Sequence, residues 1–392
     1  MTASLLVLAT IVGHFALHLA TYNRLNATGL RRRTVKRIGK LLVVSCIAIP
    51  LAATMTVDHV VPWLQPSIEE FASLPAVIQV YGAICILASV VLGVPWILWR
   101  PLWGLEWIPA KRTVEVIHVN EVVKEPLAIS RKCKWGSRIP GNQIFQLAVE
   151  QIELPMHGLP AALQGLRIAH FSDVHFTGDI SSAFTSHAVE QANRWGPDLC
   201  FITGDIIDKQ PCIAWLEPVF GKSRAKFGKF FVLGNHDLRV PDPNLTRLAL
   251  QRCGWSDAGG KATRIRLDGE EIEIIGNEYP WFPAPDIQPV AMEQETPFRL
   301  LLSHSPDRIW WARQRGVKLM LAGHTHGGQG RLPVVGPLFS PSWHGSRFAS
   351  GDFYKAPTTL HVSRGLGGVH LLRVHCRPEL SLLTLRSASP NP

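Results

Sequence analysis

Seven short apolar runs follow one another along the C-terminal two thirds of the chain, and most of them end in Asp, Asn or His. The runs are LRIAHFSD, DLCFITGD, KFFVLGNHD, EIEIIGNE, FRLLLSHS, VKLMLAGHTH and TLHVSRGLG. Segments with helical periodicity lie between some of them, at 182–195, 244–252 and 306–315. Strands that alternate with helices predict a layered α/β domain from about residue 166 onward.

The polar residues at the ends of five of these runs form the candidate site. In open α/β sheets, ligands bind beyond the carboxyl ends of the strands, so these side chains are expected to meet. Glycines beside them permit the sharp turns that would aim the side chains. The residues are Asp173 and His175, Asp205 and Asp208, Asn235 and His236, His304, and finally His324 and His326.

The donor types in this set predict a metal centre. Imidazole nitrogen is mixed with carboxylate and amide oxygen, and cysteine is missing from the motifs. That mixture suits borderline divalent cations such as Mn²⁺, Fe²⁺ or Zn²⁺ better than Ca²⁺. There are enough ligands for two divalent metal ions, which a shared carboxylate could hold about 3.5–4 Å apart, as in two-metal phosphoryl-transfer sites.

The motifs D-x-H, G-D-x-x-D, G-N-H-D, S-H and G-H-T-H, in this order, resemble the calcineurin-like metallophosphoesterase superfamily over roughly residues 166–385. GHTHGGQGRLPVVGPLF and HVSRGLG, followed by RPEL, are similar to its membrane-associated bacterial phosphohydrolase branch. The resemblance implies a metallophosphoesterase-type sandwich of two mixed β-sheets flanked by helices.

The resemblance also implies a role for each residue of the set. One metal would be held by Asp173, His175 and His326, the other by Asn235, His304 and His324, and Asp205 would bridge them. A hydroxide between the metals would attack phosphorus. His236 would protonate the leaving oxygen or stabilise its charge, and Asp208 would orient the imidazole. The alternative, a set of unrelated polar turns, does not explain so many matching residue types in register at successive strand ends.

Three apolar stretches near the N-terminus, at 4–20, 41–61 and 75–99, are long enough to suggest membrane spans. We therefore expect a transmembrane region at 1–108 with about three helices. Linker and edge strands follow at 109–160, and the metallophosphoesterase domain occupies 161–388. His14 and His18 lie on one helical face. They could bind a metal or haem, or they could simply face neighbouring helices.

The charge distribution bears on partners and topology. The formal net charge is +10, but residues 21–40 hold seven Lys/Arg and no acid, which leaves 33 basic against 30 acidic residues elsewhere. That balance gives no broad basic face for nucleic acid, and none is expected as a partner. Because short loops rich in Lys/Arg stay inside, we expect a multi-pass protein of the inner (plasma) membrane with a cytoplasmic catalytic domain. Seven scattered cysteines agree with a reducing compartment.

These features together predict a membrane-anchored, dinuclear metal-dependent phosphoesterase. Its expected substrate contains a phosphodiester or pyrophosphate bond and is lipid-linked or nucleotide-linked; the sequence leaves the oligomeric state open. Alternatives are a phosphoesterase acting on soluble nucleotides or phosphoproteins, and a metal-bound membrane receptor or scaffold without turnover. Arg331, Arg347 and Arg364 could each contact a phosphate or belong to solvated surface.

Overall fold

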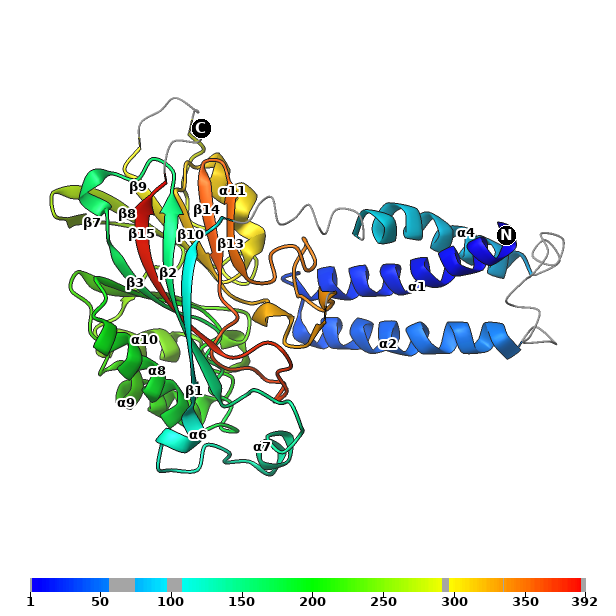
Figure 1. Ribbon diagram of the computed structural model, residues 1–392, viewed down its shortest axis with the longest axis horizontal. Coiled ribbons are helices and arrows are strands. Elements are labelled where there is room, and N and C mark those ends of the chain that lie inside the picture. Colours follow the sequence, from blue (N-terminus) through cyan, green and yellow to red (C-terminus); the bar gives the residue numbers. More distant parts are fainter. Residues whose placement is uncertain (1, 56–74, 97–107, 291–295, 334, 389–392) are drawn as a thin grey trace. The chain divides into compact units, whose positions relative to one another are not determined.

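A computed structural model describes residues 2–55, 75–96, 108–290, 296–333 and 335–388 of the chain (Figure 1). The chain divides into two compact units, Met1–Leu105 and Glu106–Pro392. In its described part the N-terminal unit is helical. It contains α1 (Thr2–Asn26), α2 (Arg32–Met55) and α4 (Ala76–Ala88), and a π-helical turn at Ser89–Gly93 continues α4.

Two helical segments in the described residues are long and apolar enough to cross a membrane, Leu5–Asn26 and Ala76–Trp96. The sequence predicts about three membrane-spanning helices. The remaining predicted segment, 41–61, lies within α2 up to Met55, and residues 56–61 fall outside the described ranges. Large apolar side chains on the helices are exposed, as at Leu41 (68%) and Val77 (75%). Such exposure is what a lipid environment would cover.

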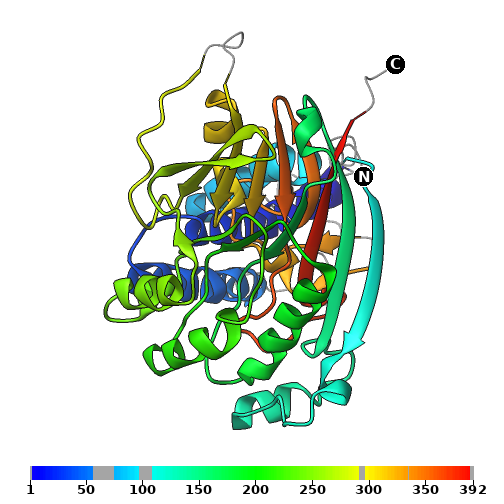
Figure 2. The ribbon, with the colours of Figure 1, turned by 90° about the vertical axis from the view of Figure 1, so that its left-hand side faces the viewer.

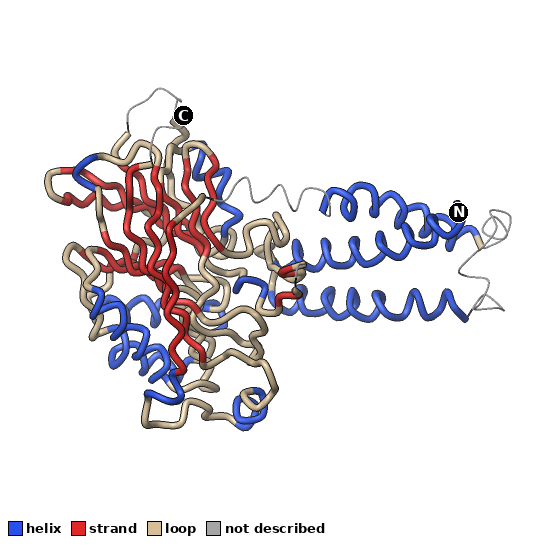
Figure 3. Tube along the Cα trace, in the orientation of Figure 1, coloured by secondary structure: helices blue, strands red, loops and turns tan. Residues whose placement is uncertain are grey.

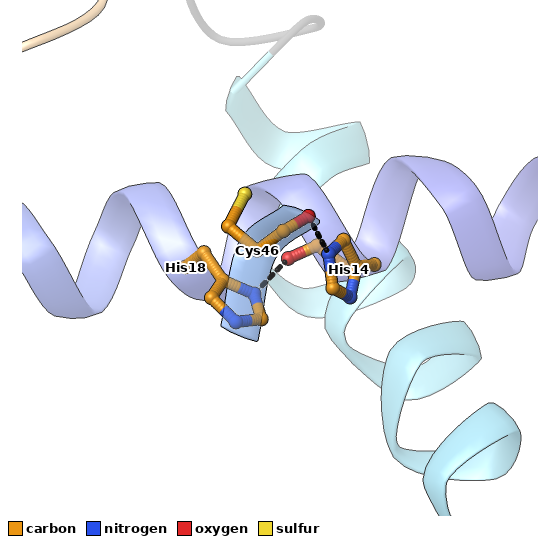
Figure 4. Close-up of side chains that lie close together, drawn as sticks. All are labelled: His14, His18 and Cys46. Atoms are coloured by element: carbon orange, nitrogen blue, oxygen red, sulfur yellow. Dashed lines mark hydrogen bonds between the residues drawn. The ribbon is translucent and has the colours of Figure 1, made fainter. Parts of the chain in front are cut away.

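His14 and His18 join the helices of this unit through hydrogen bonds (Figure 4). His14 lies 2.6 Å from the Tyr81 hydroxyl and 3.0 Å from the Cys46 carbonyl, while His18 contacts the His14 carbonyl and the Ser45 hydroxyl. One ring nitrogen of each histidine and Cys46 Sγ lie within 4.8 Å of one another. An imidazole nitrogen that is hydrogen-bonded to a carbonyl oxygen must be an N–H donor, so that nitrogen has no lone pair for a metal. This pattern favours the structural alternative.

The C-terminal unit is built on two mixed β-sheets (Figure 3). The larger sheet has seven strands, in the order β1 (Lys111–His118), β2 (Gln146–Met156), β15 (Glu379–Ser387), β3 (Arg167–Phe171), β4 (Leu199–Thr203), β5 (Gly228–Val232) and β6 (Ser256–Asp257). The smaller sheet has six, in the order β13 (Gly351–Lys355), β14 (Thr358–Val362), β10 (Leu319–Ala322), β9 (Phe298–Ser303), β8 (Glu270–Asn277) and β7 (Ala262–Leu267). A short hairpin joins β11 (Arg331–Leu332) to β12 (Gly336–Pro337).

Helices cover the outer faces of both sheets (Figures 1 and 2). Those of the larger sheet are α8 (Ser182–Trp195), α9 (Leu216–Phe220) and α10 (Asn244–Arg252), and α11 (Ile309–Gln314) packs against the smaller one. The short α6 (Val119–Val122) and α7 (Arg131–Gly136) follow β1. The predicted sandwich of two mixed sheets flanked by helices is confirmed.

Alternating side chains explain why the sheets stack. Along β4, Leu199 and Phe201 face the smaller sheet, whereas Cys200 and Ile202 face the helices, and all four are buried. Both faces of the strand are covered, so the run is apolar throughout. The ends of α8 follow from its sequence as well: the Ser181 hydroxyl accepts a hydrogen bond from the Ala183 amide, and Gly196 ends the helix with a φ of 73°.

Parallel pairing brings the strand ends to one edge of the sandwich. In the larger sheet β3, β4 and β5 are parallel neighbours, and in the smaller one β8, β9, β10 and β14 are parallel neighbours. Five polar strand ends, after β3, β4, β5, β9 and β10, therefore point to a common region.

Candidate metal centre

The predicted residues do converge at the carboxyl ends of the strands. His304 directly follows β9, and the others lie within six residues of the end of β3, β4, β5 or β10. Six of the nine residues are buried, and Asn235, His236 and His326 are half-buried. Asp173 and His304 are fully inaccessible, and Asp205 is 1% exposed.

The backbone at these positions is unusual. Left-handed φ angles occur at Asp173 (48°), His175 (49°), Asp205 (53°), His324 (70°) and His326 (50°), which are five of the seven predicted ligands. Such conformations are costly for residues other than glycine and gather at functional sites, where the surrounding fold maintains them.

One group of ligand atoms surrounds His175. Its Nε2 lies 3.1 Å from His326 Nε2, 3.5 Å from Asp205 Oδ2 and 3.9 Å from Asp173 Oδ1. His326 Nε2 is in turn 3.4 Å from Asp173 Oδ1. The four residues bring their ligand atoms within 4.8 Å of one another.

A second group surrounds His304. Its Nε2 lies 3.1 Å from Asn235 Oδ1, 3.1 Å from His324 Nδ1 and 3.2 Å from Asp205 Oδ1. Asp205 therefore turns one carboxylate oxygen toward each group, which is the arrangement that a bridging ligand requires.

All but one of these spacings fit divalent ions; the exception is the 3.9 Å between His175 Nε2 and Asp173 Oδ1. Ligand bonds of about 2.0–2.2 Å place neighbouring ligand atoms roughly 3.0–3.6 Å apart at tetrahedral or octahedral angles. The tautomers fit as well. His175 Nδ1 donates to Asp208, and His304 Nδ1 donates to the Thr203 carbonyl, so each Nε2 carries a lone pair that faces the group. Nε2 of His324 is buried without a hydrogen-bond partner among the described residues.

Asp208 connects the metal-ligand candidates to the predicted acid. Its carboxylate accepts hydrogen bonds of 2.7 Å from Nδ1 of His175 and from Nδ1 of His236. Burial would raise the pKa of Asp208, but His175 and His236 outweigh it and hold that pKa well below its usual range. Burial is also the main cause that lowers the pKa of His236, to about 4, so its imidazole is neutral in this arrangement.

Several supporting residues were not found from the sequence. The buried Asp237 carboxylate accepts amide hydrogen bonds from Ile206, Ile207 and Gly234, and so ties the loop after β4 to the loop after β5. Burial raises the pKa of Asp237 to about 7. Its amide partners Ile206 and Ile207 precede it by about 30 residues, so this pairing is visible only in three dimensions.

The aromatic loop after β8 covers the second group. The Trp281 ring lies 5.3 Å from the ring of His304 and 5.0 Å from that of His324. Glu278, the first residue of this loop, accepts a hydrogen bond of 2.5 Å from the amide of Leu233, which lies two residues before Asn235. The loop is thus part of the wall of the site.

The three arginines considered as phosphate contacts have other partners. Arg364 is bound to Glu150 and Glu379, and Arg331 to the Gly327 carbonyl and the Ser350 hydroxyl. The guanidinium of Arg347 lies over the Phe348 ring. The arginine that does contact the predicted catalytic residues is Arg239, which is bound to Asp208 and His236.

Comparison with known proteins agrees with this geometry. Residues 166–328 match the family model of the calcineurin-like phosphoesterases. The chain is 31% identical to the uncharacterized metallophosphoesterase YkuE of Bacillus subtilis, over 59% of this chain and 82% of that protein. It is 29% identical to the phosphodiesterase YaeI of Escherichia coli, over 56% and 82%.

A further relative is named as a transmembrane protein. The chain is 26% identical to a transmembrane protein with metallophosphoesterase domain from Bos taurus, over 62% of this chain and 57% of that protein. The sandwich of two mixed sheets, the Asp/His clusters at its strand ends and these matches lead to one conclusion: the chain belongs to the calcineurin-like metallophosphoesterases, which are metal-dependent phosphoric ester hydrolases.

Proposed function

We propose that the protein is a membrane-anchored phosphoesterase with two divalent metal ions, which hydrolyses a phosphodiester or pyrophosphate bond in a lipid-linked or nucleotide-linked substrate. The observation that carries the proposal is the position of Asp205, whose two oxygens lie 3.5 Å from His175 Nε2 and 3.2 Å from His304 Nε2. A single-ion site would not need two separate ligand groups that share one carboxylate.

The residues would divide as follows. Asp173, His175 and His326 would hold one ion, Asn235, His304 and His324 the other, and Asp205 both. When bound, the ions supply positive charge to the phosphoryl oxygens and lower the pKa of coordinated water. Mn²⁺, Fe²⁺ and Zn²⁺ are the candidates that the nitrogen and oxygen donors favour.

The chain's own catalytic groups are His236 and Asp208. Asp208 holds the imidazole by its Nδ1 and so directs Nε2 toward the centre, where it lies 3.9 Å from Asp205 Oδ2. Once Nε2 has taken up a proton, His236 can give that proton to the leaving oxygen or stabilise the charge on that oxygen. The side chain of His236 is 15% exposed, which leaves it open to an entering substrate.

The lipid-linked substrate is supported by two features of the chain. Two candidate membrane spans lie in the N-terminal unit, and relatives include proteins named as transmembrane proteins with a metallophosphoesterase domain. Near the site, the loop after β8 presents Tyr279, which is 48% exposed, next to Trp281. An exposed aromatic side chain beside a buried polar centre suits a substrate with one apolar and one anionic end.

The test uses the full chain in detergent. Metal-stripped protein is reconstituted with Mn²⁺, Fe²⁺ or Zn²⁺ and assayed on bis-p-nitrophenyl phosphate, then on membrane phospholipids, nucleotide-linked lipids, soluble nucleotides and phosphopeptides. Metal-dependent turnover with preference for the lipid-linked compounds is expected. Metal binding without turnover on any phosphoester would favour a receptor or scaffold, and a preference for soluble nucleotides or phosphopeptides would remove the lipid assignment.

A further inference from the structure

Arg239 lies beside the proposed acid, outside every motif that the sequence singles out. It ends the short 3₁₀ turn Asp237–Arg239 that follows G-N-H-D. One of its terminal nitrogens binds Asp208 Oδ1, and the other lies 2.6 Å from His236 Nε2. The guanidinium therefore sits at the atom of His236 that faces the centre.

We propose that Arg239 is a further catalytic residue, which contacts the substrate on the leaving-group side of phosphorus and stabilises the negative charge that develops on the leaving oxygen. This inference rests on the proposed role of His236, because that role defines which side of the phosphorus is the leaving side. Hydrolysis joins a water oxygen to phosphorus and breaks the bond to the leaving oxygen, which keeps the electron pair. The attacking water gives up one proton and the leaving oxygen takes up one; His236 Nε2, which carries a lone pair and no proton in the structure, can carry that proton between them.

The hydrogen-bonding pattern shows what Arg239 can do at this position. His236 Nδ1 donates to the Asp208 carboxylate, so Nδ1 carries the proton of the neutral ring. A guanidinium has only donors, hence Nε2 must be the acceptor in its contact with Arg239. A neutral ring nitrogen is a weaker acceptor than a phosphate oxygen, to which arginine forms short charge-assisted bonds. A substrate that enters the site offers Arg239 the better acceptor.

The position of the side chain is suited to that exchange. Arg239 is 16% exposed, so it lies at the mouth of the site and not in the sealed interior. Its anchor on Asp208 remains when the second nitrogen turns to the substrate. The fixed fork of the guanidinium then spans the carboxylate and the leaving oxygen, a geometry that a lysine could not reproduce.

The test is a series of phosphodiesters whose leaving groups differ in pKa, hydrolysed by the full metal-loaded chain in detergent. The Arg239→Ala variant is expected to lose about 100-fold in kcat for alkyl leaving groups, the scale for removing one donor at a developing oxyanion. It should lose only a few-fold for p-nitrophenolate, whose charge needs little help. Arg239→Lys should recover part of the loss, and added guanidinium should rescue Arg239→Ala.

Two measurements separate this role from a structural one. Elemental analysis should show unchanged metal content in Arg239→Ala, and Arg264→Ala, at an exposed arginine on β7, should behave as wild type. In the background of His236→Ala, removing Arg239 should cause a further loss, because Arg239 touches the leaving oxygen itself. An equal loss for all leaving groups, or no further loss in that background, would overturn the proposal. If the wild type hydrolysed no phosphodiester with any of the metals, the proposed function itself would be wrong.

Discussion

His175 Nδ1 donates a 2.7 Å hydrogen bond to Asp208 Oδ2. The sequence motif assigns Asp208 to the acid His236 alone, yet in the structure one carboxylate holds both a proposed metal ligand and the proposed acid. Metal affinity and proton transfer therefore depend on the same side chain. Carboxylates that orient a metal-bound histidine in this way also raise its basicity as a ligand.

Asp208→Ala is expected to lower both metal affinity and turnover. Loss of a carboxylate behind a ligand histidine typically costs about 10–100-fold in metal affinity. Loss of the acid's orientation adds part of the roughly 10²- to 10⁴-fold contribution of general acid catalysis. Metal titration followed by calorimetry, and kcat at saturating metal, measure the two effects separately.

His236→Ala is the matched comparison, because this residue belongs to neither ligand group. We expect full metal content and a kcat lowered by about 10²- to 10⁴-fold on a substrate with a poor leaving group. If His236→Ala bound metal as weakly as Asp208→Ala, the division between ligands and acid would be wrong.

Chelation is expected to abolish activity, and readdition of a divalent ion to restore it. Two ions per chain should be found by elemental analysis after reconstitution, since seven ligands exceed what one tetrahedral ion binds. Asp205→Ala removes the ligand shared by both groups and should leave less than one ion per chain. Undiminished turnover in EDTA, with no metal detected, would contradict the metal mechanism.

The architecture followed from the sequence because the local pattern and the tertiary fold agree. The apolar run 198–205 contains β4 (Leu199–Thr203), and the segment predicted as a helix at 182–195 is α8 with the same bounds. Parallel strands must end at one edge, so residues that follow such strands meet even when they are over a hundred positions apart, as His175 and His326 do.

The remaining parts depend on pairings that no short stretch encodes. β15 lies between β2 and β3, and its neighbours in the sheet are more than two hundred residues earlier in the chain. Similarly, Trp281 reaches His304 only because the loop after β8 folds over the strand ends. Arg239 belongs to none of the motifs, and its proposed role rests on its contacts with Asp208 and His236.

Gly323→Ala should destroy the centre through steric conflict. A Cβ at this position would lie 1.8 Å from Ser172 Oγ and 2.2 Å from Asp173 Oδ2, so the proposed ligand would be displaced. We expect loss of metal and of activity. Gly330→Ala, where a Cβ would meet nothing within 4 Å, is the control and should keep both. Metal content is the decisive measurement, and normal metal binding by Gly323→Ala would contradict the arrangement of the first group.

Glu379→Gln should reduce stability at neutral pH but not in strong acid. Burial would raise the pKa of Glu379, but Arg364, His361 and Arg112 outweigh it and bring that pKa to about 2. A folded-state pKa below the ordinary 4.5 means that ionised Glu379 stabilises the fold above pH 4.5, and that this contribution disappears as the pH falls through about 2. The free energy of unfolding should drop by roughly 2–3 kcal/mol at pH 7. Urea unfolding at several pH values should show the gap closing toward pH 2, whereas a constant gap would exclude this linkage.

The side of the membrane on which the catalytic unit lies is the remaining prediction, and it depends on how many helices cross. Basic residues follow the first candidate span, with Arg24 in its last turn and Arg32, Arg33, Lys36 and Arg37 at the start of α2. Because short basic loops are usually retained in the cytoplasm, we expect this connection to lie there. Residues 58–73 contain no Lys or Arg, so they can lie outside.

If α2 and the segment Ala76–Trp96 both cross, the chain returns inward and the catalytic unit is cytoplasmic, as we propose; if only one of them crosses, it lies outside. The free cysteines, Cys200 and Cys376 among them, agree with a reducing compartment. A reporter fused after Pro392 decides between the two. For a cytoplasmic unit, a green fluorescent protein fusion is expected to fluoresce and an alkaline phosphatase fusion to be inactive. The reverse pair of results would place the unit outside. Cysteine substitutions in 58–73, labelled from the outside with an impermeant maleimide, then show whether α2 crosses.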